Sequence, residues 1–150
     1  MLQLVRTTSE NTDFRSLVAL LDQHLRVLDG DDHAFYAQFN KIDALRQVVV
    51  AYLDDEPIGC GAIKPYSEDT AEVKRMFVDL NHRGHGIAGK ILADLESWAG
   101  ELNFSYCILE TGYNQPEAIR LYEKSGYEVI PNYGQYVGVE NSVCMKKRVA

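Results

Sequence analysis

The stretch MFVDLNHRGHGIAGK, residues 76–90, decides which fold the sequence predicts. It passes from an apolar, strand-like segment through a glycine-rich turn directly into a helix-like segment. The small residues stand where that helix would begin: Gly84, Gly86, Ala88 and Gly89. A helix start has unpaired backbone N–H groups and a partial positive charge, and small side chains let an anion approach both. With Arg83 before the helix and Lys90 inside it, the stretch predicts a cradle for a pyrophosphate.

Other phosphate-binding loops fit this stretch less well. A Walker A loop needs Ser or Thr after its Lys, whereas Lys90 is followed by Ile91. The glycines at 84, 86 and 89 have the spacing of the dinucleotide fingerprint, but that fingerprint opens a βαβ unit. Here a run of strands comes first. The alternative to a phosphate-binding loop is a tight turn that needs glycine only for its backbone angles.

The segments before the stretch predict strands in succession. Val-rich Gln47–Leu53, Ile58–Lys64 and Ala71–Asp79 are separated by short polar turns and predict an antiparallel meander. Further upstream, Leu2–Arg6 predicts a first strand. A helix follows, capped by Thr12 or Asp13, with one apolar face and a stop at Gly30. Its apolar positions are Phe14, Leu17, Val18, Leu21, Leu25 and Leu28.

The segments after the stretch predict a parallel crossover. Apolar residues at helical spacing run from Ile87 and end at Gly100, and Phe104–Glu110 predicts the next strand. A strand–helix–strand order of this length implies parallel strands. Pro116 suits the first turn of a helix that runs to Lys124 and stops at Gly126. Two closing strands are expected at Tyr127–Ile130 and Ser142–Lys147.

These elements, with a short helix expected in His33–Asn40, predict a mixed α/β fold of order β-α-α-β-β-β-α-β-α-β-β. No linker or internal repeat divides the chain, so residues 1–150 are expected to form a single domain.

Composition excludes several classes of protein. Of the 150 residues, 46% are hydrophobic and 25% are charged, which is typical of a globular protein. The net charge of −7 disfavours nucleic-acid and membrane partners; it favours either a cationic substrate or simple solubility. No signal peptide or metal-ligand spacing is visible, so we expect a cytoplasmic protein without a metal. Cys60, Cys107 and Cys144 are expected to be small buried residues rather than nucleophiles.

At this point the sequence resembles a known family. Arg83-x-x-Gly86-x-Ala88 is similar to the acyl-CoA loop of the GNAT superfamily of N-acetyltransferases. The segment AEVKRMFV, residues 71–78, resembles the fourth strand of that family. Asn114 together with Tyr122-Glu123-Lys124-x-Gly126-Tyr127 resembles its second signature. The expected order of elements is also the order of the family, in which the central parallel strands splay apart.

The resemblance implies an acetyl-CoA-dependent N-acetyltransferase that works by direct transfer in a ternary complex. The amides and side chains of the loop would hold the pyrophosphate: Arg83, Gly84, His85, Gly86, Ile87, Ala88, Gly89 and Lys90. The main chain of Met76, Phe77 and Val78 would pair with the pantetheine arm like an added strand, and Asn114 would touch that arm. Tyr122 would be the general acid toward the departing thiolate, and Glu72 stands where some members carry the general base.

Alternatives stand beside each of these roles. Glu72 is either the base or a surface strand residue, and Tyr122 is either the acid or plain core. His82 and His85 are either bases or solvated loop residues. Tyr113, Tyr127, Tyr133 and Tyr136 either line a substrate pocket or are ordinary strand aromatics.

The acceptor and the assembly are less defined by the sequence. Residues 25–45 and 131–141 are expected to select the acceptor, with a small cationic amine or an amino acid favoured over a protein N-terminus or lysine. The chain is expected to be a monomer or a homodimer, in which Tyr133–Val139 could form a strand shared between subunits. The rival functions are a non-catalytic acyl-CoA sensor and an ATP-binding protein.

Overall fold

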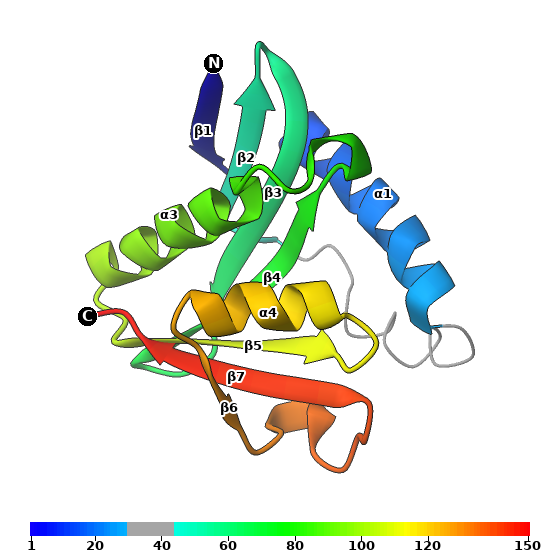
Figure 1. The fold of residues 1–150 in the computed structure, drawn as a ribbon. Helices are drawn as coiled ribbons and strands as arrows, with labels where there is room; N and C mark the ends of the chain where they lie inside the picture. Colours follow the sequence, from blue (N-terminus) through cyan, green and yellow to red (C-terminus); the bar gives the residue numbers. More distant parts are fainter. Residues whose placement is uncertain (30–43) are drawn as a thin grey trace.

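The computed structural model describes residues 1–29 and 44–150 (Figure 1). The expected helix in His33–Asn40 and the stop at Gly30 lie outside these residues. The elements are β1 (Leu2–Thr7), α1 (Thr12–Asp29), β2 (Gln47–Leu53), β3 (Glu56–Pro65), β4 (Thr70–Val78), η2 (Leu80–His82), α3 (Ile87–Glu101), β5 (Tyr106–Gly112), α4 (Pro116–Lys124), β6 (Glu128–Ile130), η3 (Gly134–Tyr136) and β7 (Ser142–Arg148). In the described parts of the chain, no helix has the length and apolar character needed to span a membrane.

The strands form one mixed sheet of seven strands in the order β1-β2-β3-β4-β5-β7-β6. Strands β1 to β4 pair antiparallel in succession, which confirms the predicted meander. Strand β4 pairs with β5 in parallel after the crossover through α3, as predicted. The closing strand β7 lies between β5 and β6, so the last strand in sequence is not at the edge.

Helices cover both faces of the sheet (Figure 1). Alternating side chains of β2 divide between the two faces. Val48 and Val50 are fully buried against the apolar face of α1, and Val49 and Ala51 are fully buried on the side of α3 and α4. A strand buried on both faces is continuously apolar, which explains the valine run of β2.

Two helix ends differ from the expectation. The cap of α1 is Asn11, whose Oδ1 accepts a hydrogen bond from the Phe14 amide at 2.9 Å, and not Thr12 or Asp13. Helix α3 continues through Gly100 to Glu101. The chain leaves this helix at Asn103, which takes a left-handed φ of 70°. Asparagine tolerates that conformation, so no glycine is needed there.

The segment Tyr133–Val139 does not form the expected strand. It contains the short 3₁₀ helix η3, and the Asn132 side chain holds the turn closed. Its Nδ2 donates to the Tyr136 carbonyl at 3.1 Å and to the Val139 carbonyl at 2.9 Å. The backbone groups that a shared strand would need are therefore engaged inside the turn.

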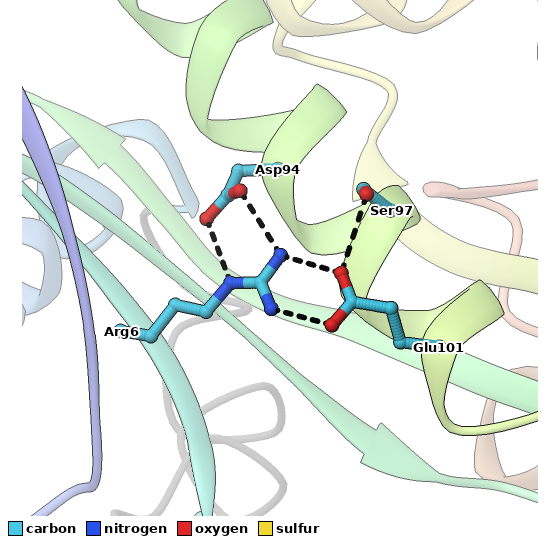
Figure 2. Close-up of polar contacts among 4 residues, drawn as sticks. All are labelled: Arg6, Asp94, Ser97 and Glu101. Atoms are coloured by element: carbon cyan, nitrogen blue, oxygen red, sulfur yellow. Dashed lines mark hydrogen bonds and ion pairs between the residues drawn. The ribbon is translucent and has the colours of Figure 1, made fainter.

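A cluster around Arg6 ties the first strand to α3 (Figure 2). The Arg6 guanidinium donates to both oxygens of Glu101 at 2.9 and 3.0 Å, and to both oxygens of Asp94 at 3.2 and 3.4 Å. It also lies 4.8 Å from the centre of the Trp98 ring. The hydrogen bonds from Arg6 hold the pKa of the Glu101 carboxyl below its usual range.

Strands β4 and β5 pair over a short length. Their parallel register has three pairs and ends at Glu72 opposite Ile108. Beyond this point the strands diverge, which confirms the predicted splay. A register shift places Arg75 and Met76 of β4 opposite the single residue Gly61 of β3, and Arg75 takes a left-handed φ of 61°. This bulge strengthens the local bend of β4.

Gly61 provides the room that the bulge requires. A Cβ at this position would lie 2.5 Å from Met76 Sδ and 2.9 Å from Leu95 Cδ1. We expect Gly61→Ala to lower the free energy of unfolding by about 1–3 kcal/mol, because the Met76 and Leu95 side chains must leave their packed positions. Urea unfolding measures this change.

Gly100→Ala is the matched control. Its Cβ would lie 3.7 Å from the Val149 carbonyl, in ordinary contact, and alanine favours a helix by about 1 kcal/mol over glycine. We expect this variant to be at least as stable as the parent chain. Equal stability of the two variants would contradict the packing argument.

Candidate active site

A cleft of about 530 Å³ opens where β4, α3 and α4 converge. Its lining includes eight of the residues predicted to bind the cofactor: Met76, Phe77, Val78, Arg83, Gly84, Ile87, Ala88 and Asn114. Four other predicted residues do not line it: His85, Gly86, Gly89 and Lys90. The predicted strand, loop and helix are thus brought to one cavity.

The start of α3 has the geometry of an anion site. Gly86 precedes the helix with a left-handed φ of 75°, and Gly84 has a φ of 84°. No side chain caps this helix start, and its first main-chain bond runs from the Lys90 amide to the Gly86 carbonyl at 3.2 Å. The preceding amides have no acceptor within the helix. They are available to an anion that approaches from the cleft.

Arg83 is held at the cleft rather than free in solvent. Its Nε donates to the Val78 carbonyl at 2.9 Å, and its guanidinium lies 5.7 Å from the centre of the Phe77 ring. The side chain is thereby oriented beside the end of β4. Arginine in a fixed orientation is suited to bind phosphate oxygens.

The two loop histidines take different positions. His82 lines the cleft, and its Nδ1 lies 3.6 Å from a carboxylate oxygen of Asp79. His85 is exposed and lies outside the cleft lining. Neither histidine lines the second cavity, where Glu72 is found.

This second, smaller cavity of about 120 Å³ adjoins the cleft on the α1 side of the sheet. The two cavities share Leu21, Met76, Gln115, Ala118 and Tyr122 in their linings. They therefore meet at the splay between β4 and β5, where residues from both faces of the sheet line the cavities. Glu72 lines the smaller cavity. The predicted acid, Tyr122, and the predicted base, Glu72, therefore line the same cavity.

Tyr122 is both a core residue and a lining residue of the two cavities. It belongs to the apolar cluster under α3 and α4, and its ring meets the Tyr127 ring edge to face at 5.8 Å. Burial raises the pKa of the Tyr122 phenol above its usual range, and the Glu110 carboxylate adds to this shift. The phenol therefore keeps its proton at neutral pH.

Glu72 is not a surface residue, because only 3% of it is exposed. Its Oε2 accepts a hydrogen bond of 2.6 Å from the Tyr133 hydroxyl, which lies 61 positions away in the sequence. The surface reading of Glu72 is therefore wrong. Burial, followed by the Glu72 charge, raises the pKa of the Tyr133 phenol, so Tyr133 remains a donor to this carboxylate.

Of the other tyrosines, some line a cavity and some do not. Tyr136 lines the smaller cavity. Tyr127 is buried in the core, and Tyr113 is exposed. Segment 131–141 thus contributes Tyr136 to the cavity directly and Tyr133 through Glu72.

Several residues of the site lack a local signal in the sequence. His24 and Leu21 reach the cleft from α1, and Gln115 reaches it from the start of α4. Burial lowers the pKa of His24, and the nearby Arg83 lowers it further. Lys74, Arg75 and Glu110 line the smaller cavity.

In the described parts of the chain, the cysteines are buried and the potential metal ligands are not clustered. Cys60, Cys107 and Cys144 are all buried and free. Burial raises the pKa of the Cys60 and Cys107 thiols to about 12, so both are protonated and poor nucleophiles. Among the described residues, no group of His, Cys, Asp and Glu has the arrangement of a metal site.

The chain is similar to known acetyltransferases. The profile of the acetyltransferase (GNAT) family matches residues 14–127. The chain is 37% identical over 100 residues to the IAA acetyltransferase of Azospirillum brasilense, which covers 66% of this chain and 65% of that protein.

Solved structures share the whole fold. A protein of Klebsiella pneumoniae assigned as an acyl-CoA N-acyltransferase has a TM-score of 0.84 and 29% identity, over 100% of this chain and 99% of that one. The PaiA N-acetyltransferase of Thermoplasma acidophilum, solved with coenzyme A, has a TM-score of 0.73 at 15% identity, over 99% of each chain. The family profile covers most of the chain, including the loop and the second signature, and the chain therefore belongs to the GNAT family of acetyltransferases.

Proposed function

We propose that the protein transfers the acetyl group of acetyl-CoA to the primary amine of a small molecule, by direct attack within a ternary complex. The observation that carries this proposal is the meeting of two cavities at the β4–β5 splay, with Tyr122 in both linings. One cavity has the features of an acyl-CoA site, and the other has carboxylates suited to an amine. The acceptor is a small cationic amine or an amino acid.

The cofactor half rests on the geometry of the larger cleft. The free amides at the start of α3 and the Arg83 guanidinium would bind the pyrophosphate of acetyl-CoA. The unpaired edge of β4 at Met76 to Val78 would bind the pantetheine arm, and Asn114 would contact that arm from the other wall. The complex of the Thermoplasma acidophilum protein with coenzyme A supports this ligand, since that protein has the same fold.

The chemical half rests on Glu72 and Tyr122. Glu72 would take a proton from the ammonium form of the acceptor, directly or through water, because the neutral amine is the nucleophile. The amine nitrogen then bonds to the thioester carbon and gives up its second proton, which restores the Tyr122 phenol through solvent, and the carbon–sulfur bond breaks with its electron pair on sulfur. Tyr122 would donate its proton to that sulfur. A backbone amide near Val78 would stabilise the negative charge that develops on the carbonyl oxygen.

Positioning contributes more than either side chain alone. Acid–base assistance accelerates a reaction by about 10²–10⁴-fold. Holding the two reactants together in the correct geometry contributes up to about 7–11 kcal/mol. The splay is therefore the principal catalytic feature, because it brings the two cavities into contact.

Binding of acetyl-CoA tests the cofactor half. We expect calorimetry to detect micromolar binding of acetyl-CoA and much weaker binding of ATP, and we expect Arg83→Glu to lower the acetyl-CoA affinity about 10–100-fold. The matched control is Arg120→Glu, which reverses an exposed charge of α4 outside the cleft lining. Tight binding of ATP alone would favour the nucleotide-binding alternative.

Replacement of Tyr122 tests the general acid. We expect Tyr122→Phe to lower kcat about 10²–10⁴-fold and to leave the Kd of acetyl-CoA within about twofold. The raised pKa of Tyr122 keeps the phenol protonated, so its contribution would be lost only at high pH. The ratio of parent to variant kcat should therefore stay constant between about pH 7 and pH 9. Unchanged turnover would exclude this role and favour a structural one.

Replacement of Glu72 tests the general base. Gln keeps an acceptor for the Tyr133 hydroxyl but cannot take a proton, so we expect Glu72→Gln to lower kcat/KM about 10²–10⁴-fold near pH 7. Activity should recover at high pH, where more of the acceptor amine is already neutral. The control Glu123→Gln removes an exposed carboxylate of α4 and should be silent. A loss that does not depend on pH would contradict the role of base.

A further inference from the structure

The bulge in β4 places two consecutive basic residues in the smaller cavity. In a regular strand, neighbouring side chains point to opposite faces of the sheet. Here Arg75 takes a left-handed φ of 61°, and the register with β3 shifts at this point. As a result Lys74 and Arg75 both line the cavity that contains Glu72.

The Arg75 side chain is buried with part of its hydrogen-bonding capacity unused. Its exposed fraction is 3%, and its Nη1 donates to Asp22 Oδ1 of α1 at 3.1 Å. Its Nη2 is buried and has no acceptor in the part of the chain that the structure describes. Buried donors in folded proteins are nearly always satisfied, and an orphaned guanidinium nitrogen is therefore a place for a ligand oxygen.

Lys74 adds a second cation beside this donor. It lines the same cavity as Arg75. Burial lowers the pKa of Lys74, and the charges of Lys64 and then Arg75 lower it further, whereas Glu72 and Glu110 oppose this shift. An anion next to Lys74 and Arg75 would relieve their mutual repulsion and their burial cost.

The same cavity also has an anionic side. Glu72 and Glu110 line it, and Glu110 lies close enough to Tyr122 to raise the pKa of that phenol. These carboxylates suit an ammonium group near the point where the two cavities meet. The cavity therefore offers partners for both a positive and a negative group on one small molecule.

We propose that the acceptor is a free amino acid, whose carboxylate binds Lys74 and Arg75 while its amine faces Glu72 and Tyr122. This inference rests on the proposed function and narrows its acceptor class. A simple amine would leave Arg75 Nη2 without an acceptor and would bring a third positive charge beside Lys74 and Arg75. A carboxylate can bind an arginine through two oxygens, which also fixes its orientation. The carboxylate takes no part in the chemistry, so the product is an N-acetyl amino acid and free CoA.

Matched acceptors test the carboxylate site. The full chain is assayed with acetyl-CoA and the standard amino acids, each compared with its decarboxylated amine and with its carboxamide, by release of the CoA thiol. We expect at least one amino acid to react with a kcat/KM about tenfold or more above both of its partners. Equal or faster reaction of the amines would overturn the inference, and so would reaction of no amino acid by a chain that binds acetyl-CoA.

Variants of Lys74 test whether the preference for an amino acid over its matched amine arises in this cavity. We expect Lys74→Met to lower kcat/KM for the preferred amino acid about 10–100-fold, mainly through KM, and to change kcat/KM for the matched amine by less than about twofold. Lys74→Arg should restore much of the loss. The control Lys124→Met removes an exposed charge at the end of α4 and should change neither. Arg75→Gln should act in the same direction as Lys74→Met, with folding checked by thermal unfolding.

The outcomes separate the two levels of the proposal. Failure to bind acetyl-CoA would overturn the proposed function itself. Binding and turnover of amines without regard to a carboxylate would leave that function intact and overturn the amino-acid inference. A loss in Lys74→Met that is equal for amino acid and amine would also overturn it, since a general structural defect would explain such a loss.

Discussion

The site depends on the point where β4 stops pairing with β5. A parallel sheet normally continues its hydrogen-bond ladder, and unpaired backbone groups buried away from water are unfavourable. Here the ladder ends at Glu72 opposite Ile108, and the rest of β4 presents a free edge to the cleft. That edge, the free amides of α3 and Tyr122 of α4 all reach the opening. The divergence of two strands therefore creates a binding site from backbone groups that an ordinary sheet would use internally.

The divergence also connects the two faces of the sheet. The α3 and α4 side contains Tyr122, and the α1 side contains Glu72 and the basic residues of the bulge. A continuous sheet would keep these groups on opposite faces. Because β4 and β5 part, residues from both layers line adjoining cavities. Gly61 supports this arrangement from β3, since its lack of a side chain leaves room for Met76.

Much of the fold was predictable because its signals are local. Pro116 and Gly126 bracket α4, and the predicted bounds of that helix match the structure. The alternation of apolar strands and short turns predicted the meander in the same way. The glycines at 84 and 86 have positive φ, as the motif requires. The acyl-CoA loop and the splay of the parallel strands were predicted from the resemblance to the GNAT family, which rests on Arg83, Gly86 and Ala88 of this loop.

The remaining features depend on contacts that no local pattern encodes. Asn11, Thr12 and Asp13 are all good capping residues, and the backbone alone decides that Asn11 serves. The bulge at Arg75 and the turn at Asn103 use left-handed conformations at residues other than glycine, so they leave no glycine signal. The bond between Tyr133 and Glu72 joins residues 61 positions apart. Tertiary packing determines the bond between Tyr133 and Glu72, as it does the reach of His24 and Gln115 into the cleft.

The Arg6 cluster has a consequence for the order of folding (Figure 2). Its bonds to Asp94 and Glu101 span 88 and 95 positions of sequence. β1 also pairs with β2, which lies beyond α1 and the segment that follows it. Contacts of such long range form slowly, because a large loop must close before any of them is made. The contacts of β1 with α3 require that helix to be in place, so we expect them to form late in folding.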